Sequence, residues 1–294
     1  MPIDPTQLAA LSAILRLGSF DAAASSLNVT PSAISQRLKA LEEQVGASLI
    51  NRSQPCTATP LGARLAKHAE DVALLEAAAL GDLRRDGALP ARLTLAVPAD
   101  SIATWLLSAL SAVPDMLFDL RVDDQDTADA WLKRGAVSAA VTGHHRAVAG
   151  CDLHPLGALR YIATASPAFM QRYFAKGVTA QSLARAPILT FTPKDQLQSR
   201  WITAKTGATL HPPSHQMPST HAFVDAALAG MAWGMNPETL VRDHLDCGRL
   251  IALDTALPMD VPLYWQVTRV MAPALAPLTA AILGAAREQL RHAP

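Results

Sequence analysis

The polar side chains best suited to recognise another molecule lie between residues 31 and 39 and recur at helical spacing. An apolar stripe through Ile34 and Leu38 occupies the other face of the expected helix. Glutamine can pair with adenine edges in the major groove of DNA, arginine with guanine, and serine with a base or a phosphate. On these side chains alone, an ordinary solvated helix face explains the pattern at least as well. The residues opposite the stripe are Ser32, Ser35, Gln36 and Lys39.

The elements around this segment favour the recognition role. Leucines at helical spacing predict a first helix over 4–17, and Ser19 can cap a second one. Thr30 and Pro31 supply an N-cap and a first-turn proline for the third helix, which ends at Gly46. Three short helices with a tight turn between the last two form a helix-turn-helix.

Two small expected strands, 49–52 and 56–58, form a wing and complete a winged helix-turn-helix domain over 1–58. We expect this domain to bind duplex DNA. The residues expected at the DNA are Ser19, Thr30, Pro31, Ser32, Ser35, Gln36, Arg37, Lys39 and Arg52.

Charge does not support this expectation. Residues 1–60 carry four basic and four acidic side chains, and the whole chain has a formal net charge of zero. A generic nucleic-acid binder has a basic surplus. Binding must therefore come from the placement of a few cations, from helix N-termini and from two copies acting together.

The segment after the wing carries a signal for pairing with a second copy of the chain. Thr59 and Pro60 repeat the cap-and-proline pattern and begin a long linker helix over 59–86. Its apolar positions alternate in steps of four and three, which is the heptad pattern of a coiled coil. We therefore expect this helix to pair with the same helix of a second copy of the chain. The seam residues are Leu61, Leu65, Val72 and Leu75.

Strands and helices alternate over 89–294, which is typical of α/β units with largely parallel sheets. We expect two lobes: lobe I over about 89–161 plus 267–294, with the C-terminal helix returning to it, and lobe II over about 162–266. The expected strands are 92–97, 118–122, 137–142, 159–165, 187–191, 231–235, 250–253 and 263–270. The expected helices are 101–111, 127–134, 167–174, 196–206, 220–229, 237–246 and 273–290.

A ligand site is expected beyond the carboxyl end of the first of these strands, because open α/β sheets bind ligands there. The helix start at Ser101 favours a carboxylate, and Asp100 could face a positive group. Helix capping by Asp100, and a solvated turn for Asp123 and Asp124, are equally good explanations. The complete candidate set is Asp100, Ser101, Asp123, Asp124, Thr142, Ser219, Thr220 and His221.

Other functions lack support in the sequence. No nucleophile-elbow, zinc-protease or phosphate-loop motif is present, so we expect no enzyme and no cofactor. The histidines form no metal-ligand set, and the three cysteines form no CxxC pair. There is neither a signal peptide nor an apolar stretch of about 20 residues. We expect a cytoplasmic protein that does not enter a membrane.

The N-terminal motifs resemble those of the LysR-type transcriptional regulators. The resemblance covers Gly18–Ala24, Leu27–Glu42, Leu49–Arg52 and Thr59–Gly62. It implies a periplasmic-binding-protein-like effector domain, a homodimer or homotetramer, promoter DNA as a partner and indirect action on RNA polymerase.

A narrower resemblance, to the ArgP/LysG subgroup, lies after the linker. It rests on Ala99–Leu107, Val122–Asp124, Leu156–Leu159, Gly177–Thr179 and Leu263–Trp265. The subgroup regulates basic amino-acid export, so the resemblance implies lysine or arginine as effector and an exporter promoter as target. The chain departs from it at His221, where the subgroup usually has an acidic residue, and in the strand 231–237.

The alternatives are a two-lobed solute-binding module, an α/β enzyme, and a LysR-type regulator that responds to a non-basic ligand. The helix-turn-helix and the lack of an export signal disfavour the first, and the lack of catalytic motifs disfavours the second.

Overall fold

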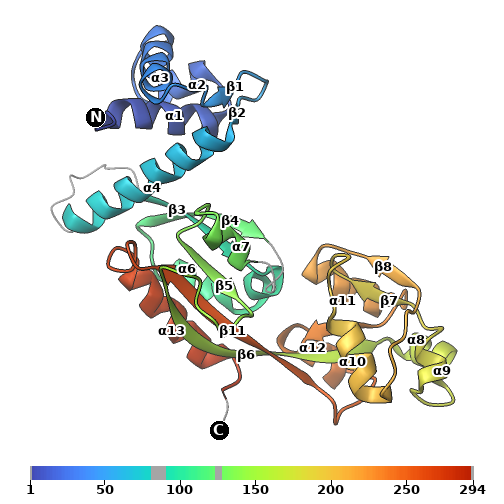
Figure 1. Ribbon diagram of the computed structural model, residues 1–294. Helices are drawn as coiled ribbons and strands as arrows, with labels where there is room; N and C mark the ends of the chain where they lie inside the picture. Colours follow the sequence, from blue (N-terminus) through green and yellow to red (C-terminus); the bar gives the residue numbers. More distant parts are fainter. Residues whose placement is uncertain (1, 81–90, 123–127, 293–294) are drawn as a thin grey trace.

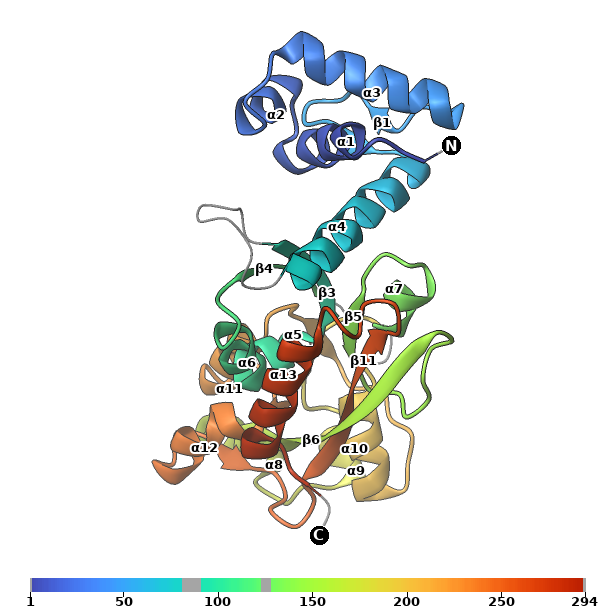
Figure 2. The ribbon, with the colours of Figure 1, turned by 90° about the vertical axis from the view of Figure 1, so that its left-hand side faces the viewer.

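The computed structural model describes residues 2–80, 91–122 and 128–292. A small helical domain lies at one end of the long helix α4 (Pro60–Leu80), and a two-lobed α/β part lies at the other end (Figures 1 and 2).

The N-terminal domain begins its helices where the sequence predicts capping side chains. Ser19 accepts a hydrogen bond from the backbone N–H of Ala22, and Thr30 accepts one from Ala33. Each hydroxyl satisfies an N–H that has no partner within the helix. The helices are α1 (Pro5–Leu17), α2 (Phe20–Ser26) and α3 (Pro31–Val45).

The wing consists of β1 (Ile50–Asn51) paired with β2 (Thr57–Ala58), and α4 begins directly after it. Gly62 lies so close to the wing that a Cβ atom there would be 1.8 Å from the carbonyl oxygen of Leu49. Only glycine permits this approach, which fixes α4 against the base of the wing.

The heptad positions of α4 divide between two environments. Leu61 and Leu65 pack on the core of the N-terminal domain. Val72 is half-buried and Leu75 is exposed. The first half of the expected seam is thus used within the chain, because the N-terminal domain needs α4 to cover its apolar face.

One seven-stranded sheet runs through the α/β part in the order β10-β6-β11-β5-β3-β4, with β9 also paired to β6. A second sheet joins β7 and β8. The strands of the large sheet are β3 (Ala91–Val97), β4 (Met116–Val122), β5 (Ala139–Thr142), β6 (Cys151–Ala165), β9 (Gly234–Pro237), β10 (Ile251–Ala252) and β11 (Met259–Thr268). Those of the small sheet are β7 (Ile188–Thr190) and β8 (Ser214–Gln216).

The long strands β6 and β11 cross between the lobes (Figure 1). They pair antiparallel from Met259↔Tyr161 to Thr268↔Cys151. The expectation of largely parallel pairing holds for β3 with β4 and β5, and for β7 with β8. It is wrong for β6, β9, β10 and β11, because one strand carries the chain into lobe II and another returns it.

Helices cover both lobes. Lobe I carries a continuous helical stretch made of α5 (Ala99–Ser101), a π-helical segment (Ile102–Leu106) and α6 (Leu107–Ser111), followed by α7 (Asp129–Lys133). The C-terminal helix α13 (Ala276–Gln289) packs against α6. Lobe II carries α8 (Pro167–Phe174), α9 (Ala180–Leu183), α10 (Leu197–Thr206), α11 (Thr220–Leu228) and α12 (Glu238–Asp246).

None of the helices in the described part of the chain combines the length and the apolar character that crossing a bilayer requires.

Candidate functional site

The outward face of α3 presents the polar side chains that the sequence singles out. Ser32, Ser35, Gln36 and Lys39 are all exposed, and Ile34 on the opposite face is fully buried. Lys39 lies 3.7 Å from Glu43, and both side chains remain well exposed. An exposed pair of this kind holds the lysine only weakly, so Lys39 stays available to a phosphate.

The two arginines of the candidate set have partners within the domain. Arg37 is half-buried and lies near Asp4. The pKa of Asp4 is lowered mainly by hydrogen bonds from Thr6, with a smaller contribution from the Arg37 charge. The Arg52 guanidinium lies 5.6 Å from the centre of the Phe20 ring, which ties the wing to α2.

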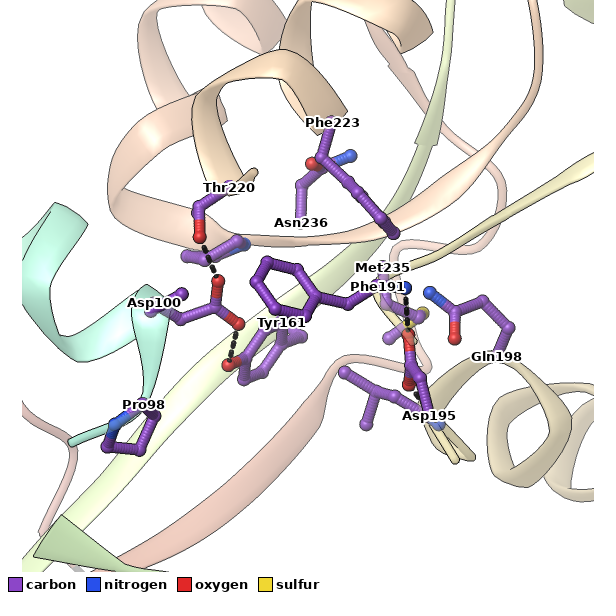
Figure 3. A pocket seen from close by; sticks show the side chains of 13 residues that line it. Pro98, Asp100, Tyr161, Phe191, Asp195, Gln198, Thr220, Phe223, Met235 and Asn236 are labelled. Atoms are coloured by element: carbon purple, nitrogen blue, oxygen red, sulfur yellow. Dashed lines mark hydrogen bonds between the residues drawn. The ribbon is translucent and has the colours of Figure 1, made fainter. Parts of the chain in front are cut away.

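The α/β part has a pocket where the two lobes meet (Figure 3). Lobe I contributes Pro98–Asp100, directly after β3, and β6 contributes Tyr161. Lobe II contributes the remaining lining residues from the β7–α10 loop, the start of α10, α11 and β9: Phe191, Asp195, Leu197, Gln198, Thr220, Phe223, Met235, Asn236 and Pro237.

Asp100 joins the lobes through its carboxylate. The Tyr161 hydroxyl donates to Oδ2 at 2.5 Å, and the Thr220 hydroxyl donates to Oδ1 at 2.6 Å (Figure 3). Burial raises the pKa of Asp100, and the negative charge of Asp195 raises it further, while the hydrogen bonds from Thr220 and Tyr161 act in the opposite direction. The site thus holds a desolvated carboxylate for which a cation is the natural partner.

Asp195 provides a second carboxylate to the same pocket. Its oxygens accept from the backbone N–H groups of Phe191 at 2.9 Å and Leu197 at 3.0 Å, so its position is set by the loop that begins α10. The Phe191 side chain extends from the Asp195 side of the pocket toward Asp100 (Figure 3).

Two buried amides add acceptor oxygens to the lining. Asn236 donates from Nδ2 to the Thr164 hydroxyl at 2.9 Å, which fixes the direction of its amide. Within the described residues, neither Asn236 Oδ1 nor Gln198 Oε1 has a hydrogen-bond donor. Buried acceptors without donors are uncommon in folded proteins, and a donor-rich ligand would satisfy them.

The free space in the pocket is only ≈ 40 Å³. A single water needs roughly 10–15 Å³, so the cavity has room for about three. An amino acid needs more room than this. Phe191 or one lobe must therefore move when such a ligand enters.

The structure brings only part of the predicted ligand set to the pocket. Asp100 and Thr220 line it, whereas four others do not. Asp123 and Asp124 lie outside the described residues. Of the four, Ser101 and Thr142 are buried, with Thr142 accepting from Gln266, while Ser219 caps α11 and His221 is exposed on that helix.

Sequence reasoning missed Tyr161, Phe191, Asp195, Gln198 and Asn236. One signal could have found Asp195, because it lies in a strand–loop–helix unit of the same kind as Asp100. The others belong to elements that the sequence identifies only as structure, and their shared location depends on how the two lobes meet.

The lining residues contain two carboxylates and no lysine, arginine or histidine. Such a pocket suits a ligand with positive charge. In the described part of the chain, no group of three His, Cys, Asp or Glu side chains is arranged to hold a metal ion.

Comparison with known proteins agrees with both halves of this architecture. The family described as "Bacterial regulatory helix-turn-helix protein, lysR family" matches residues 5–63, and the "LysR substrate binding domain" matches residues 86–287. The chain belongs to the LysR family. It is a DNA-binding transcriptional regulator with an effector-binding domain.

Individual relatives of this LysR-family regulator match over nearly their full length. It is 38% identical to the "Lysine export transcriptional regulatory protein LysG" of Corynebacterium glutamicum, over 98% of this chain and 100% of the relative. The crystal structure of ArgP from Mycobacterium tuberculosis is 41% identical, with a TM-score of 0.79 and full coverage of both chains. Full-length LysG from C. glutamicum with bound effector Arg is 38% identical, with a TM-score of 0.65, over 98% and 100% of the chains.

Replacing Asp100 with asparagine tests the buried carboxylate. Because the folded-state pKa of Asp100 is raised, the unfolded chain loses its proton first as the pH rises, and the wild type loses stability from about pH 4 up to that raised pKa. Asp100→Asn does not ionise. The difference in thermal stability between this variant and wild type should therefore shift in favour of the variant over that pH window. At pH 7 it should remain more in favour of the variant than it is at pH 3.

Asp254→Asn is the matched control, because a hydrogen bond from Lys205 lowers the pKa of Asp254. Its relative stability should decrease as the pH rises through the unfolded-state pKa. Thermal melts between pH 3 and pH 8 measure both. An Asp100→Asn protein that is less stable than wild type at pH 7 but equal to it at pH 3 would contradict the desolvated carboxylate.

Proposed function

We propose that this LysR-family regulator senses a basic amino acid, lysine or arginine, in the pocket between its lobes and thereby controls the promoter of an amino-acid exporter. In this proposal residues 1–58 bind DNA, residues 59–86 pair two chains, and residues 89–294 bind the effector. The protein acts in the cytoplasm, where its operator is, and influences RNA polymerase indirectly.

The observation that carries the proposal is the pair of carboxylates in one pocket with no cation among the lining residues. Asp100 is buried, and the charge of Asp195 raises its pKa, so Asp195 makes the Asp100 carboxyl more costly to ionise. A ligand with positive charge at two places, such as the α-ammonium and side chain of a basic amino acid, relieves this repulsion. LysG from C. glutamicum, a close relative, has a structure with bound effector Arg.

The same pocket suggests how the signal arises. A basic amino acid must displace Phe191 or separate the lobes, because the free space is ≈ 40 Å³. It also competes with Thr220 and Tyr161 for the Asp100 carboxylate. The ligand thus binds one lobe arrangement better than another, and a shift between arrangements re-spaces the recognition helices of a dimer on the operator.

The alternatives receive less support. In a regulator that responds to a neutral or acidic ligand, Asp100 and Asp195 would face a ligand without positive charge to pair with them. A solute-binding module or an enzyme would not need the N-terminal domain, which matches the LysR family over residues 5–63.

Calorimetric titration with charged and neutral analogues tests the effector class. Lysine or arginine should bind, and their neutral analogues norleucine and citrulline should bind about tenfold or more weakly, since a charge-assisted hydrogen bond contributes roughly 1.5–3 kcal/mol. Asp195→Asn should weaken binding of the basic ligand by a similar factor, while the control Asp254→Asn should not. Binding of only neutral or acidic compounds would refute the basic effector and leave the family assignment intact.

Two substitutions on α3 test the recognition surface. Gln36→Ala should cost about 1–3 kcal/mol and relax preference at one base pair, because an exposed glutamine at the start of α3 can read an adenine edge. Arg37, near Asp4 at the helix edge, is placed to contact a phosphate. Arg37→Ala should therefore weaken binding to all DNA sequences alike and reduce the slope of log affinity against log salt concentration by about one.

Gln44→Ala, an exposed glutamine near the other end of α3, is the control. Selected operator DNA is titrated at several salt concentrations by fluorescence anisotropy. Unchanged affinity and specificity in Gln36→Ala would remove that residue from the proposed DNA contact.

The pairing proposal concerns the outward part of α4. Val72 and Leu75 are not part of the N-terminal core, and a second copy can cover them. Val72→Glu/Leu75→Glu should sediment as a monomer, because it places charges in an apolar seam. Ala63→Glu, exposed on the same helix but outside the seam, should keep the native oligomer. A native oligomer in both variants would exclude the seam.

A further inference from the structure

A buried polar contact joins the linker helix α4 to lobe I. Lys67 Nζ donates to Asp71 Oδ1 at 2.5 Å and to the Ser138 hydroxyl, and that hydroxyl donates to the same Asp71 oxygen at 2.6 Å. The three groups form a closed triangle in which two corners belong to α4 and one belongs to lobe I. Lys67 is only 8% exposed.

A second polar pair lies one turn away. The Thr94 hydroxyl on β3 donates to Glu70 Oε2 at 3.0 Å. Burial raises the pKa of the Glu70 carboxyl, while the Thr94 hydrogen bond and the Lys67 charge act in the opposite direction. Leu74, on the next turn, is buried in the core of lobe I. We call these six residues, Lys67, Glu70, Asp71, Leu74, Thr94 and Ser138, the helix–lobe contact.

The helix–lobe contact contains more charged groups than a contact that only packs α4 against lobe I would need. Lysine is rarely buried, and a buried ion pair is often no more stabilising than apolar residues of the same volume. Its geometry is stricter, however, because hydrogen bonds fix both distance and angle. The contact therefore sets the rotation and position of α4 more sharply than apolar packing of Leu74 alone would.

One strand of this contact also leads to the pocket. Thr94 lies within β3, and Asp100 lies three residues beyond the end of that strand. Ser138 directly precedes β5, which pairs parallel with β3 at Leu95↔Ala139. Thr94 and Asp100 are thus separated by about 20 Å of largely extended chain. Both strands adjoin the contact with α4, and β3 leads from it to the effector pocket.

We propose that the helix–lobe contact is the joint through which the effector pocket sets the orientation of the DNA-binding domain, with Lys67, Glu70, Asp71, Thr94 and Ser138 as positioning residues. This inference rests on the proposed function for its effector. When the effector binds Asp100, the movement of the β3 end changes the position of Thr94 and Ser138, and α4 follows them because its polar groups have no other buried partners among the described residues.

Removing the two lobe I hydroxyls tests the joint with little change in volume. In Thr94→Val/Ser138→Ala, α4 loses three hydrogen bonds to lobe I, one at Thr94 and two at Ser138, each worth about a two- to tenfold shift in equilibrium. Hydrogen–deuterium exchange over 67–74 should become at least about fourfold faster. The effector-induced change in operator affinity should fall to less than about a third of the wild-type factor, with effector affinity within about twofold of wild type.

Ser111→Ala/Thr206→Val is the matched control, since it removes hydroxyls of the same kind from α6 and α10. It should change none of these measurements. Lys67→Met, which removes the buried charge, should act as the first double variant does, whereas Lys133→Met, from the exposed pair with Asp129, should not. These variants keep the proposal testable if either double variant fails to fold.

The readouts separate the joint from the effector assignment. A Thr94→Val/Ser138→Ala protein with normal exchange over 67–74 and wild-type coupling would overturn the joint. Faster exchange with full coupling would also overturn it, because the contact would then be structural only. A wild-type protein that binds neither lysine nor arginine would refute the proposed effector, and the exchange measurement would still decide whether the helix–lobe contact orients α4.

Discussion

The antiparallel pairing of β6 with β11 is the interaction on which the arrangement of the α/β part depends. These strands pair over most of their length, and they carry the chain into lobe II and back (Figure 1). Tyr161, which donates to Asp100, lies on β6, so one side of the pocket is fixed to the crossing strands themselves. Bending of this two-stranded crossing moves lobe II relative to Asp100 without breaking either core. The placement of the pocket at the crossing therefore makes ligand binding sensitive to lobe geometry.

The pocket combines groups that lower the stability of the folded chain. A cation or a hydrogen-bond donor would stabilise the desolvated carboxyl of Asp100, the nearby charge of Asp195, and the acceptor oxygens of Gln198 and Asn236, which have no donor among the described residues. Proteins commonly accept such a loss of stability where a ligand must bind. The hydrogen bonds that Thr220 and Tyr161 donate to Asp100 compensate for part of this loss.

Local patterns predicted the helices well because their signals are local. Ser19 and Thr30 cap the helices that the sequence assigns to them, and the expected helix 167–174 has its predicted bounds. The long strand β6 was predicted only over 159–165, because its first half pairs with β11, more than a hundred residues away. The strand expected over 231–235 lies at Gly234–Pro237, where pairing with β6 rather than local composition sets the register. Asp100 could be predicted from its place after β3, but the grouping of Asp195, Gln198 and Asn236 with it requires the lobes to meet.

The close approach at Gly62 has a mechanical consequence. Because α4 contacts the base of the wing there and also covers the N-terminal core through Leu61 and Leu65, the DNA-binding domain and α4 move as one rigid body. The 21 residues of α4 span about 30 Å, so a tilt of about 10° at the lobe I end displaces the far end by about 5 Å. Successive turns of DNA repeat at about 34 Å. A displacement of several ångströms in each of two DNA-binding domains changes their separation relative to this repeat, so a small rotation at the lobe becomes a change in operator fit.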